Sequence, residues 1–246
     1  MTIRIAMWSG PRNISTAMMR SFGARADCTV SDEPFYGAYL KQSGEPQPMA
    51  DTIIADMDCD WHSVTRALNG PPPEPASIWY QKHMPHHMIG PVDISAFYGH
   101  RHAFLIREPE LVIASYAKKR VTVTFDDLRY DRQLEYVRAV ADISGSPPPV
   151  IDSGLFLHDP EGHLRALCAV LCLQWDPAML RWKAGLHAND GIWASHWYDR
   201  VAQSTHFAPA AETRPALSGS ARALAERCRP FYQEMKHYAL EPSEYG

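Results

Sequence analysis

Short apolar runs alternate with longer amphipathic stretches along most of the chain. The first apolar run, Ile5 to Trp8, is typical of a buried strand, and Ala103 to Ile106 is the clearest later one. Three shorter β-favouring runs are further candidate strands. They are Thr29–Ser31, Ile78–Gln81 and Val150–Ile151.

Apolar residues at helical spacing mark the stretches between these runs. The first such stretch opens at Ser15 and Thr16 and is closed by Gly23. One short helix is expected within Ile53 to Leu68, and Pro230 is expected to break or kink the last helix. The other helices are expected after Pro109, from Tyr130 to Ala141, after Asp159-Pro160 and through Leu217 to Cys228.

Strands that alternate with helices predict a parallel sheet with helices on both of its faces. With 246 residues and 46% hydrophobic content, the chain is expected to form one α/β domain over residues 1–246. The predicted fold class is therefore a three-layer α/β/α arrangement around a central parallel sheet.

Charge and composition exclude several classes of protein. A net charge of −4 leaves no basic surface for nucleic acid, and no stretch is apolar for long enough to span a membrane. The N-terminus lacks the pattern of a signal peptide, so we expect a cytoplasmic protein with no membrane partner. The five cysteines contain no Cys-x-x-Cys pair and are expected to be small core residues rather than disulfides.

Polar side chains follow several of the predicted strands. Ligands of an open parallel sheet bind at the carboxyl ends of its strands. Arg12, Glu33, His83 and Arg107 all come at such ends. The sequence therefore predicts one site at this edge of the sheet.

The opening loop, residues 9–13, leads into the first helix. The unpaired N–H groups and the dipole at a helix start attract anions, and the guanidinium of Arg12 suits phosphate or sulfate oxygens. The alternative is an ordinary turn in which Ser15 or Thr16 merely caps the helix.

Arg107 and Ser115 form a second candidate anion site. Arg107 follows a buried strand and Ser115 comes about two helical turns later, so both side chains can reach one phosphate near the helix start. The alternative is a surface ion pair for Arg107 and a core-edge position for Ser115.

His83 is a candidate general base because it ends a strand beside Lys82 and the pKa of histidine lies near working pH. The alternative is a loop histidine with no catalytic role. His86 and His87 lie close by, but no carboxylate or cysteine stands at ligand spacing, so no metal site is expected.

In this order, the motifs resemble those of the sulfotransferases that use 3′-phosphoadenosine 5′-phosphosulfate (PAPS). That family binds the 5′-phosphosulfate with a Pro-Lys/Arg-Ser-Gly-Thr/Ser-Thr loop after the first strand, which Pro11 to Thr16 matches. Its Arg-x-Pro-x5-Ser element, which holds the 3′-phosphate, is matched from Arg107 through Ser115. Its Lys-Thr-His-Leu-Pro element, which carries the catalytic histidine, is similar to Gln81 through Pro85.

The resemblance implies a P-loop-like sulfotransferase fold of bacterial type, PAPS as the co-substrate and no metal. It implies sulfuryl transfer to a hydroxyl or amine of an unidentified small-molecule acceptor, with His83 as the general base. Arg12 and Lys82 would take part in catalysis. The donor-binding residues that it implies are Arg12, Asn13, Ile14, Ser15, Thr16, Arg107 and Ser115.

The acceptor side follows from the same resemblance. Glu33 would face the crevice as an acceptor contact or an alternative base, or else serve only as a cap or ion-pair carboxylate. Phe35 and Tyr36, together with the later segment 193–198, are expected to line the acceptor pocket, although such aromatic residues also form cores.

Three features depart from the family pattern. Asn13-Ile14 replaces the usual Ser-Gly, and Gln81 stands in the position of the first lysine. The Arg-Lys-Gly element near the C-terminus, which is the family's second clamp on the 3′-phosphate, is not found in the sequence. Arg200 or Arg214 is the candidate replacement.

Two alternatives to this function stay open. A P-loop kinase or nucleotide hydrolase has the same strand–loop–helix anion site, but it requires Gly-x4-Gly-Lys-Ser/Thr and an acidic metal ligand, and neither is found. The other alternative is a nucleotide-binding protein that kept the fold and lost the reaction. The sequence predicts no oligomeric state.

Overall fold

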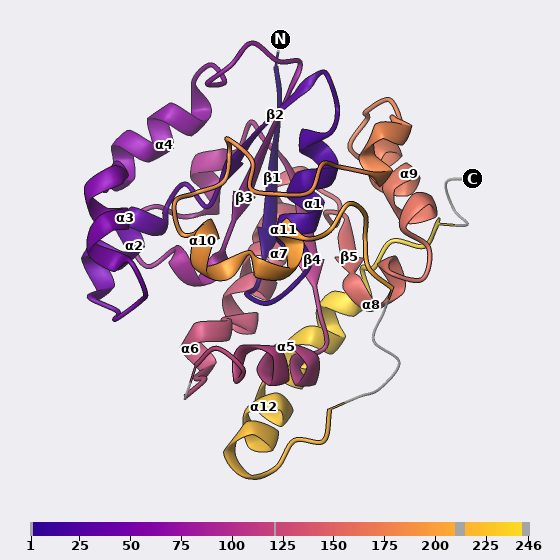
Figure 1. Ribbon diagram of the computed structural model, residues 1–246. Helices are drawn as coiled ribbons and strands as arrows, with labels where there is room; N and C mark the ends of the chain where they lie inside the picture. Colours follow the sequence, from indigo (N-terminus) through magenta and orange to yellow (C-terminus); the bar gives the residue numbers. More distant parts are fainter. Residues whose placement is uncertain (1, 121, 210–214, 243–246) are drawn as a thin grey trace.

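A five-stranded parallel sheet organises the chain (Figure 1). The computed structural model describes residues 2–120, 122–209 and 215–242. All five predicted strands are present, in the order β2-β3-β1-β4-β5, and β3 continues to His83, beyond the end predicted at Gln81. The strands are β1 (Ile3–Ser9), β2 (Cys28–Asp32), β3 (Ile78–His83), β4 (Arg101–Ile106) and β5 (Val150–Asp152).

Helices fill the connections between the strands and follow the last strand. Those before β4 are α1 (Ser15–Gly23), α2 (Tyr36–Ser43), α3 (Ala50–Asp56) and α4 (Trp61–Asn69), with 3-10 turns at Pro85–His87 and Ile94–Phe97. Those after β4 are α5 (Pro109–Tyr116), α6 (Phe125–Leu128), α7 (Tyr130–Ser144), α8 (Ser153–Phe156), α9 (Pro160–Val170), α10 (Ala194–Trp197), α11 (Asp199–Ala202) and α12 (Gly219–Lys236), with a 3-10 turn at Pro177–Leu180.

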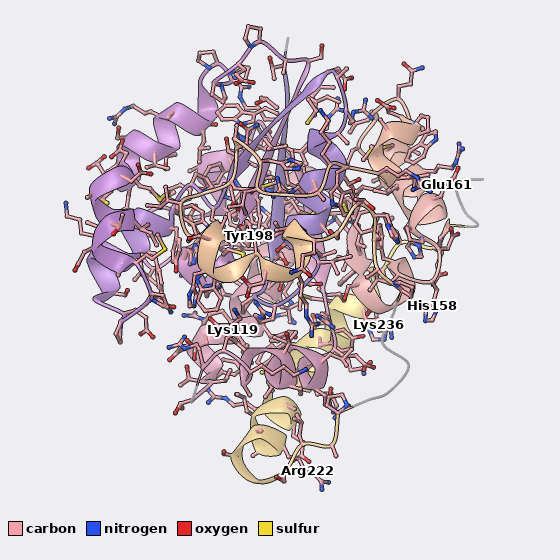
Figure 2. All side chains as sticks on the ribbon, in the orientation of Figure 1. Lys119, His158, Glu161, Tyr198, Arg222 and Lys236 are labelled. Atoms are coloured by element: carbon pink, nitrogen blue, oxygen red, sulfur yellow. The ribbon has the colours of Figure 1, made fainter. Side chains whose placement is uncertain are left out.

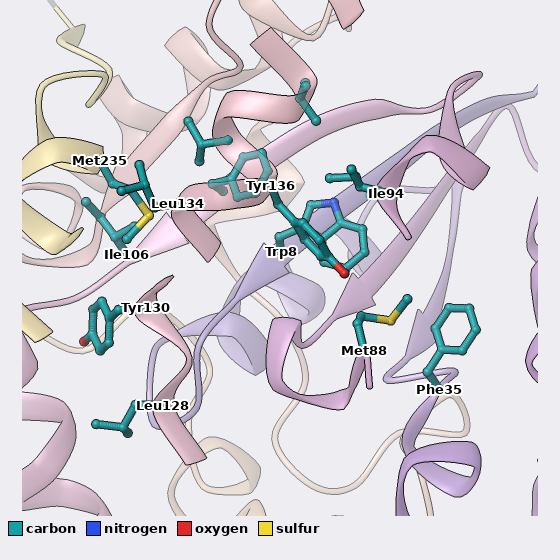
Figure 3. Close-up of a cluster of buried hydrophobic side chains, with 14 of the residues drawn as sticks. Trp8, Phe35, Met88, Ile94, Ile106, Leu128, Tyr130, Leu134, Tyr136 and Met235 are labelled. Carbon is teal, nitrogen blue, oxygen red and sulfur yellow. The ribbon is translucent and has the colours of Figure 1, made fainter. Parts of the chain in front are cut away.

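Helices cover both faces of the sheet, which confirms the predicted three-layer α/β/α fold. On one face, side chains of α4, α5, α7 and α12 pack against strand residues such as Trp8 and Ile106 (Figure 3). On the other face, α1, α8 and α9 pack against Ile5, Met7 and Leu105. Since neighbouring side chains of a strand point to opposite faces, each strand contributes to both cores.

The prediction of a single helix within Ile53 to Leu68 is wrong, because the chain forms α3 and α4 there. Met57 is extended, with φ −101° and ψ 152°, and it ends α3. The side chain of Asp60 then accepts a hydrogen bond from Ser63 N at 2.6 Å and caps α4. A capping carboxylate starts a new helix more favourably than it continues an old one.

A break or kink was predicted at Pro230, and the break is not found, because α12 runs from Gly219 to Lys236. Cys228 lies before Pro230, Tyr232 and Met235 lie after it, and all three side chains are buried. The hydroxyl of Tyr232 donates to Asp152 Oδ2 at 2.5 Å. These contacts on both sides of the proline offset the hydrogen bond that it removes from the helix.

No helix in the described ranges is long and apolar enough to cross a membrane.

The half-buried ring of His102 stacks on Trp8 on the face of the sheet covered by α4 and α7. The indole of Trp8 donates to His102 Nδ1 at 3.1 Å, so the proton of His102 lies on Nε2, which is 3.1 Å from the carbonyl oxygen of Phe97. Burial lowers the pKa of His102 and of the neighbouring His100 to about 4. Both rings are therefore neutral in the folded protein at neutral pH.

This arrangement predicts a loss of stability in mild acid. Because the folded chain holds these pKa values down, the unfolded chain binds more protons below about pH 6.5, and the free energy of unfolding falls as pH falls. His102→Gln removes one such group. Between pH 7.5 and 5.5, the free energy of unfolding measured in urea titrations should therefore fall by about 1 kcal/mol less in this variant than in the wild type. The exposed His62→Gln is the control, and an equal reduction there would contradict the assignment.

Candidate active site

A cavity of about 370 Å³ lies at the carboxyl ends of the strands. The loop after β1, the ends of β2 and β3, and the first turns of α1 form its floor. Residues 183–209, which we call the strap, cross over it and carry α10 and α11 (Figure 1). Tyr198 lies on the strap between these two short helices (Figure 2).

The loop between β1 and α1 turns sharply at Arg12, whose φ is +54°. This left-handed conformation is rare for a residue with a side chain and is concentrated at functional sites. Ile14, which stands where the family has glycine, has φ −85° and needs no such freedom. Asn13 Nδ2 donates to the Leu105 carbonyl at 3.1 Å, and this bond ties the loop to the end of β4.

The start of α1 faces the cavity with its backbone donors available. Ser15, Thr16 and Ala17 all line the cavity. Among the described residues, no side chain caps α1. A backbone hydrogen bond at its start runs from Met18 N to the Ile14 carbonyl. The helix therefore presents unpaired N–H groups and the positive end of its dipole to an anion in the cavity.

Arg12, Arg107 and Ser115 all line the cavity as predicted, but Ser115 bonds to Arg12 of the other predicted anion site. The Nη1 of Arg107 donates to the Arg12 carbonyl at 2.7 Å, and Arg12 Nε donates to Ser115 Oγ at 3.3 Å. Burial lowers the pKa of both guanidinium groups, and the charge of Arg200 lowers both further. Arginine stays charged in proteins, so these shifts reflect the cost of burying cations that an anionic ligand would offset.

Arg200 is the third guanidinium at this end of the cavity, and it comes from α11 on the strap. In the described parts of the chain, no carboxylate forms an ion pair with Arg12, Arg107 or Arg200. Arg214, the other candidate named from the sequence, lies outside the described residues.

Lys82 occupies the opposite wall of the cavity as a buried ammonium group. Its Nζ donates to Asp32 Oδ1 at 2.8 Å, to Glu33 Oε1 at 2.6 Å and to the Tyr198 hydroxyl at 2.8 Å. Tyr198 in turn donates to Asp32 Oδ2 at 2.6 Å. Burial alone would lower the pKa of Lys82, but the two carboxylates raise it well above its usual range, so Lys82 stays charged.

Glu33 follows β2 and also adopts a left-handed conformation, with φ +44°. Its side chain is 12% exposed and lines the cavity. One carboxylate oxygen accepts from Lys82, and the other lies 3.9 Å from His87 Nε2. Glu33 is thus a carboxylate held in place with one oxygen directed toward a neutral ring.

His83 does not reach the cavity, contrary to the prediction. It follows Lys82 in β3, so its side chain points to the opposite face of the sheet. There it stacks on Trp8 at 4.6 Å between ring centroids and contacts Phe35 and Phe97, and the residue is 1% exposed. Burial lowers the pKa of His83 well below its usual range.

Phe35 is the second residue that the structure removes from the predicted pocket. It is 2% exposed and packs on Trp61 in the core, away from the cavity. Tyr36, the next residue, does line the cavity, as predicted. The aromatic wall also includes the following side chains: Tyr39, Tyr116, Trp193, Trp197 and Tyr198.

Two histidines after β3 complete this wall. The ring of His87 stacks between Tyr36 and Tyr39, with centroid distances of 4.6 and 4.8 Å. Burial lowers the pKa of His87 well below its usual range, and Lys82 acts in the same direction. Burial likewise lowers the pKa of His86. In the portions of the chain that are described, no group of three or more histidine, cysteine or acidic residues is arranged to hold a metal.

Sequence reasoning missed Asp32 and the role of Tyr198 beside it. Asp32 carried a usable signal, since it is a carboxylate on the same strand end as Glu33 and Lys82 follows the neighbouring strand. Tyr198 lies in the aromatic segment 193–198 that was expected to line the pocket, and it does line the cavity, but its contacts with Lys82 and Asp32 carried no sequence signal because these residues are distant in sequence.

Most of the chain matches a known protein family. A family model described as a sulfotransferase domain covers residues 3–239, and the chain belongs to this family.

Two plant proteins are similar to the chain in sequence. Branched-chain-amino-acid aminotransferase-like protein 2 of Arabidopsis thaliana is 32% identical over 95% of this chain, and protein 1 is 32% identical over 97%. The chain spans 42% of the length of each relative. The aminotransferase-like name belongs to those longer proteins.

A solved structure supports the fold. The sulfotransferase domain of the Synechococcus PCC 7002 olefin synthase superposes with a TM-score of 0.55 over 92% of this chain and 94% of that domain. The two sequences are 14% identical, so this likeness concerns the fold alone.

The contacts of Tyr198 predict that it stabilises the strap. Tyr198→Phe removes the hydroxyl shared by Lys82 and Asp32 and leaves buried charges short of a partner, so the free energy of unfolding should fall by about 1–3 kcal/mol in urea titrations. Tyr98→Phe is the matched control, because Tyr98 is 74% exposed. An equal loss in both variants would refute this role.

Proposed function

We propose that the chain transfers a sulfuryl group from PAPS to a hydroxyl or amine of a small-molecule acceptor. One observation carries this proposal. Three guanidinium groups without carboxylate partners among the described residues meet the open start of α1 in one cavity of a sulfotransferase-domain chain. A doubly phosphorylated nucleotide with a sulfate supplies the negative charges that such a cavity would neutralise.

The donor is proposed to lie between the two anion sites. The amides of residues 15–17 and Arg12 would hold the phosphosulfate, and Arg107 with Ser115 would hold the 3′-phosphate. Arg200 would take the place of the family's missing C-terminal clamp, since it lines the cavity and acts electrostatically on both Arg12 and Arg107.

The transfer would be an in-line displacement at sulfur. The acceptor oxygen or nitrogen forms a bond to sulfur, while the bond from sulfur to the bridging phosphate oxygen breaks and adenosine 3′,5′-bisphosphate leaves. Negative charge moves to that oxygen, and Arg12 and the helix start would stabilise it there. The acceptor proton would pass to a base in the cavity wall.

Glu33 is proposed as this base, in place of His83. It lines the cavity, and His83 is buried on the other face of the sheet. Lys82 binds one carboxylate oxygen of Glu33. The other oxygen lies near His87. Lys82 itself stays charged and would act by electrostatic stabilisation rather than by taking up a proton.

Donor identity is tested by ligand-induced thermal shifts. Adenosine 3′,5′-bisphosphate should raise the melting temperature far more than ATP, because only the bisphosphate fits both anion sites. Arg107→Ala and Arg200→Ala should each weaken its binding about tenfold or more. Arg222→Ala is the control, since this residue is exposed on α12 (Figure 2). Equal shifts with ATP would favour a kinase-like enzyme instead.

The base is tested by single-turnover transfer from PAPS to a simple phenol. Glu33→Gln keeps the size and the hydrogen bond of the side chain but removes its basicity, so the rate should fall about a hundredfold with donor binding unchanged. His83→Gln should transfer at a near wild-type rate per folded molecule. The opposite result, with the loss at His83, would return the role of base to the histidine.

A further inference from the structure

The charged side chains that line the cavity fall into two groups. One end carries Arg12, Arg107 and Arg200, without ion-pair partners among the residues described. The other end, beyond Glu33, is lined by aromatic, histidine and uncharged polar side chains. The acceptor of the proposed transfer would lie at this second end.

Carboxylates outnumber cations at the acceptor end. Lys82 is the only ammonium or guanidinium at this wall of the cavity among the described lining residues, and it is shared by Asp32 and Glu33 at 2.8 and 2.6 Å. One ammonium group is therefore shared by two carboxyl groups, and burial raises the pKa of one of them, Asp32. His86 and His87 add no positive charge, because burial lowers the pKa of both rings well below the usual range.

A second cluster behind this wall repeats the pattern. Arg120 is shared by Glu45 at 2.5 Å and Asp127 at 2.6 Å. Its guanidinium lies over the ring of Tyr116, which lines the cavity, at 5.6 Å from the ring centroid. This cation is thus also shared by two carboxylates, and the excess charge behind the aromatic wall is negative.

The wall itself consists largely of aromatic rings. Tyr36 and Tyr39 enclose the ring of His87, and Trp197 packs edge-on against Tyr116 at 6.5 Å. Such surfaces bind planar or aliphatic bodies and attract cations to their ring faces. An anionic group at this end would meet aromatic faces and cations that are already paired with carboxylates, with no unpaired cation among the described residues to bind it.

We propose that the acceptor is an uncharged or cationic molecule with an apolar, preferably aromatic, body, and that this end of the cavity rejects anionic acceptors. The proposal rests on the proposed function, because it assigns the second substrate of the same transfer. It separates this chain's acceptors from carboxylated, phosphorylated or already sulfated hydroxyl compounds. The reacting hydroxyl would lie beside Glu33, with the rest of the molecule against the aromatic wall.

The test compares three phenols of similar size that differ in charge. Tyramine is cationic, 4-ethylphenol is uncharged and 3-(4-hydroxyphenyl)propionate is anionic. With PAPS as the donor, kcat/KM for tyramine and for 4-ethylphenol should each exceed that for the propionate by about tenfold or more. Equal or faster transfer to the propionate, or transfer to none of the three, would overturn the proposal.

A binding measurement distinguishes failure of the proposed function from failure of the acceptor assignment. Binding of adenosine 3′,5′-bisphosphate is measured first by calorimetry, without any acceptor. If the bisphosphate binds and the order of the phenols is reversed, the acceptor assignment alone is wrong. If the bisphosphate does not bind and no transfer occurs, the sulfuryl-transfer proposal fails and the acceptor assignment fails with it.

A charge variant at the rim provides an independent check. Gln47 is half-buried, lines the cavity and lies two residues after Glu45. Gln47→Lys adds a cation there, so the preference against the propionate should fall about three- to tenfold relative to the wild type. Gln47→Met, of similar length and without charge, should leave the preference unchanged. The same change in both variants would show that charge at this end does not select the acceptor.

Discussion

The buried ammonium of Lys82 holds together three parts of the chain that are distant in sequence. Asp32 and Glu33 bring the end of β2 to it, and Tyr198 brings the strap. A buried ion is costly unless hydrogen bonds satisfy it, so each of these partners is needed where it lies. The cluster thereby positions Glu33 and the strap, and with them two sides of the cavity.

Two residues at strand ends adopt left-handed conformations, and both lie in the cavity. Arg12 and Glu33 have φ values of +54° and +44°. Such conformations cost about 1–3 kcal/mol each and persist only where surrounding contacts enforce them. Here the enforcing contacts are visible, because Arg107 binds the Arg12 carbonyl and Lys82 binds the Glu33 side chain. The strain is therefore coupled to the same groups that line the site.

The two ends of the cavity differ in how their charges are compensated. At the end that carries Arg12, Arg107 and Arg200, the guanidinium groups lack carboxylate partners among the described residues, so their charge is available to an anionic ligand. At the other end, each cation is shared by two carboxylates. In the proposed transfer, this difference would stabilise a loose transition state that moves negative charge toward the leaving phosphate.

The sequence by itself determined the alternation of strands and helices, and with it the edge of the sheet where Arg12, Glu33 and Arg107 meet. These follow from local periodicity and from the parallel direction of the strands. Only the tertiary structure decided to which face of the sheet the side chains of Lys82 and His83 point. A strand buried on both sides shows no alternation, so its sequence does not tell which neighbour points toward α1 and which toward α4. The strap's Tyr198 and Arg200 likewise reach the site only through long-range packing, which local patterns do not encode.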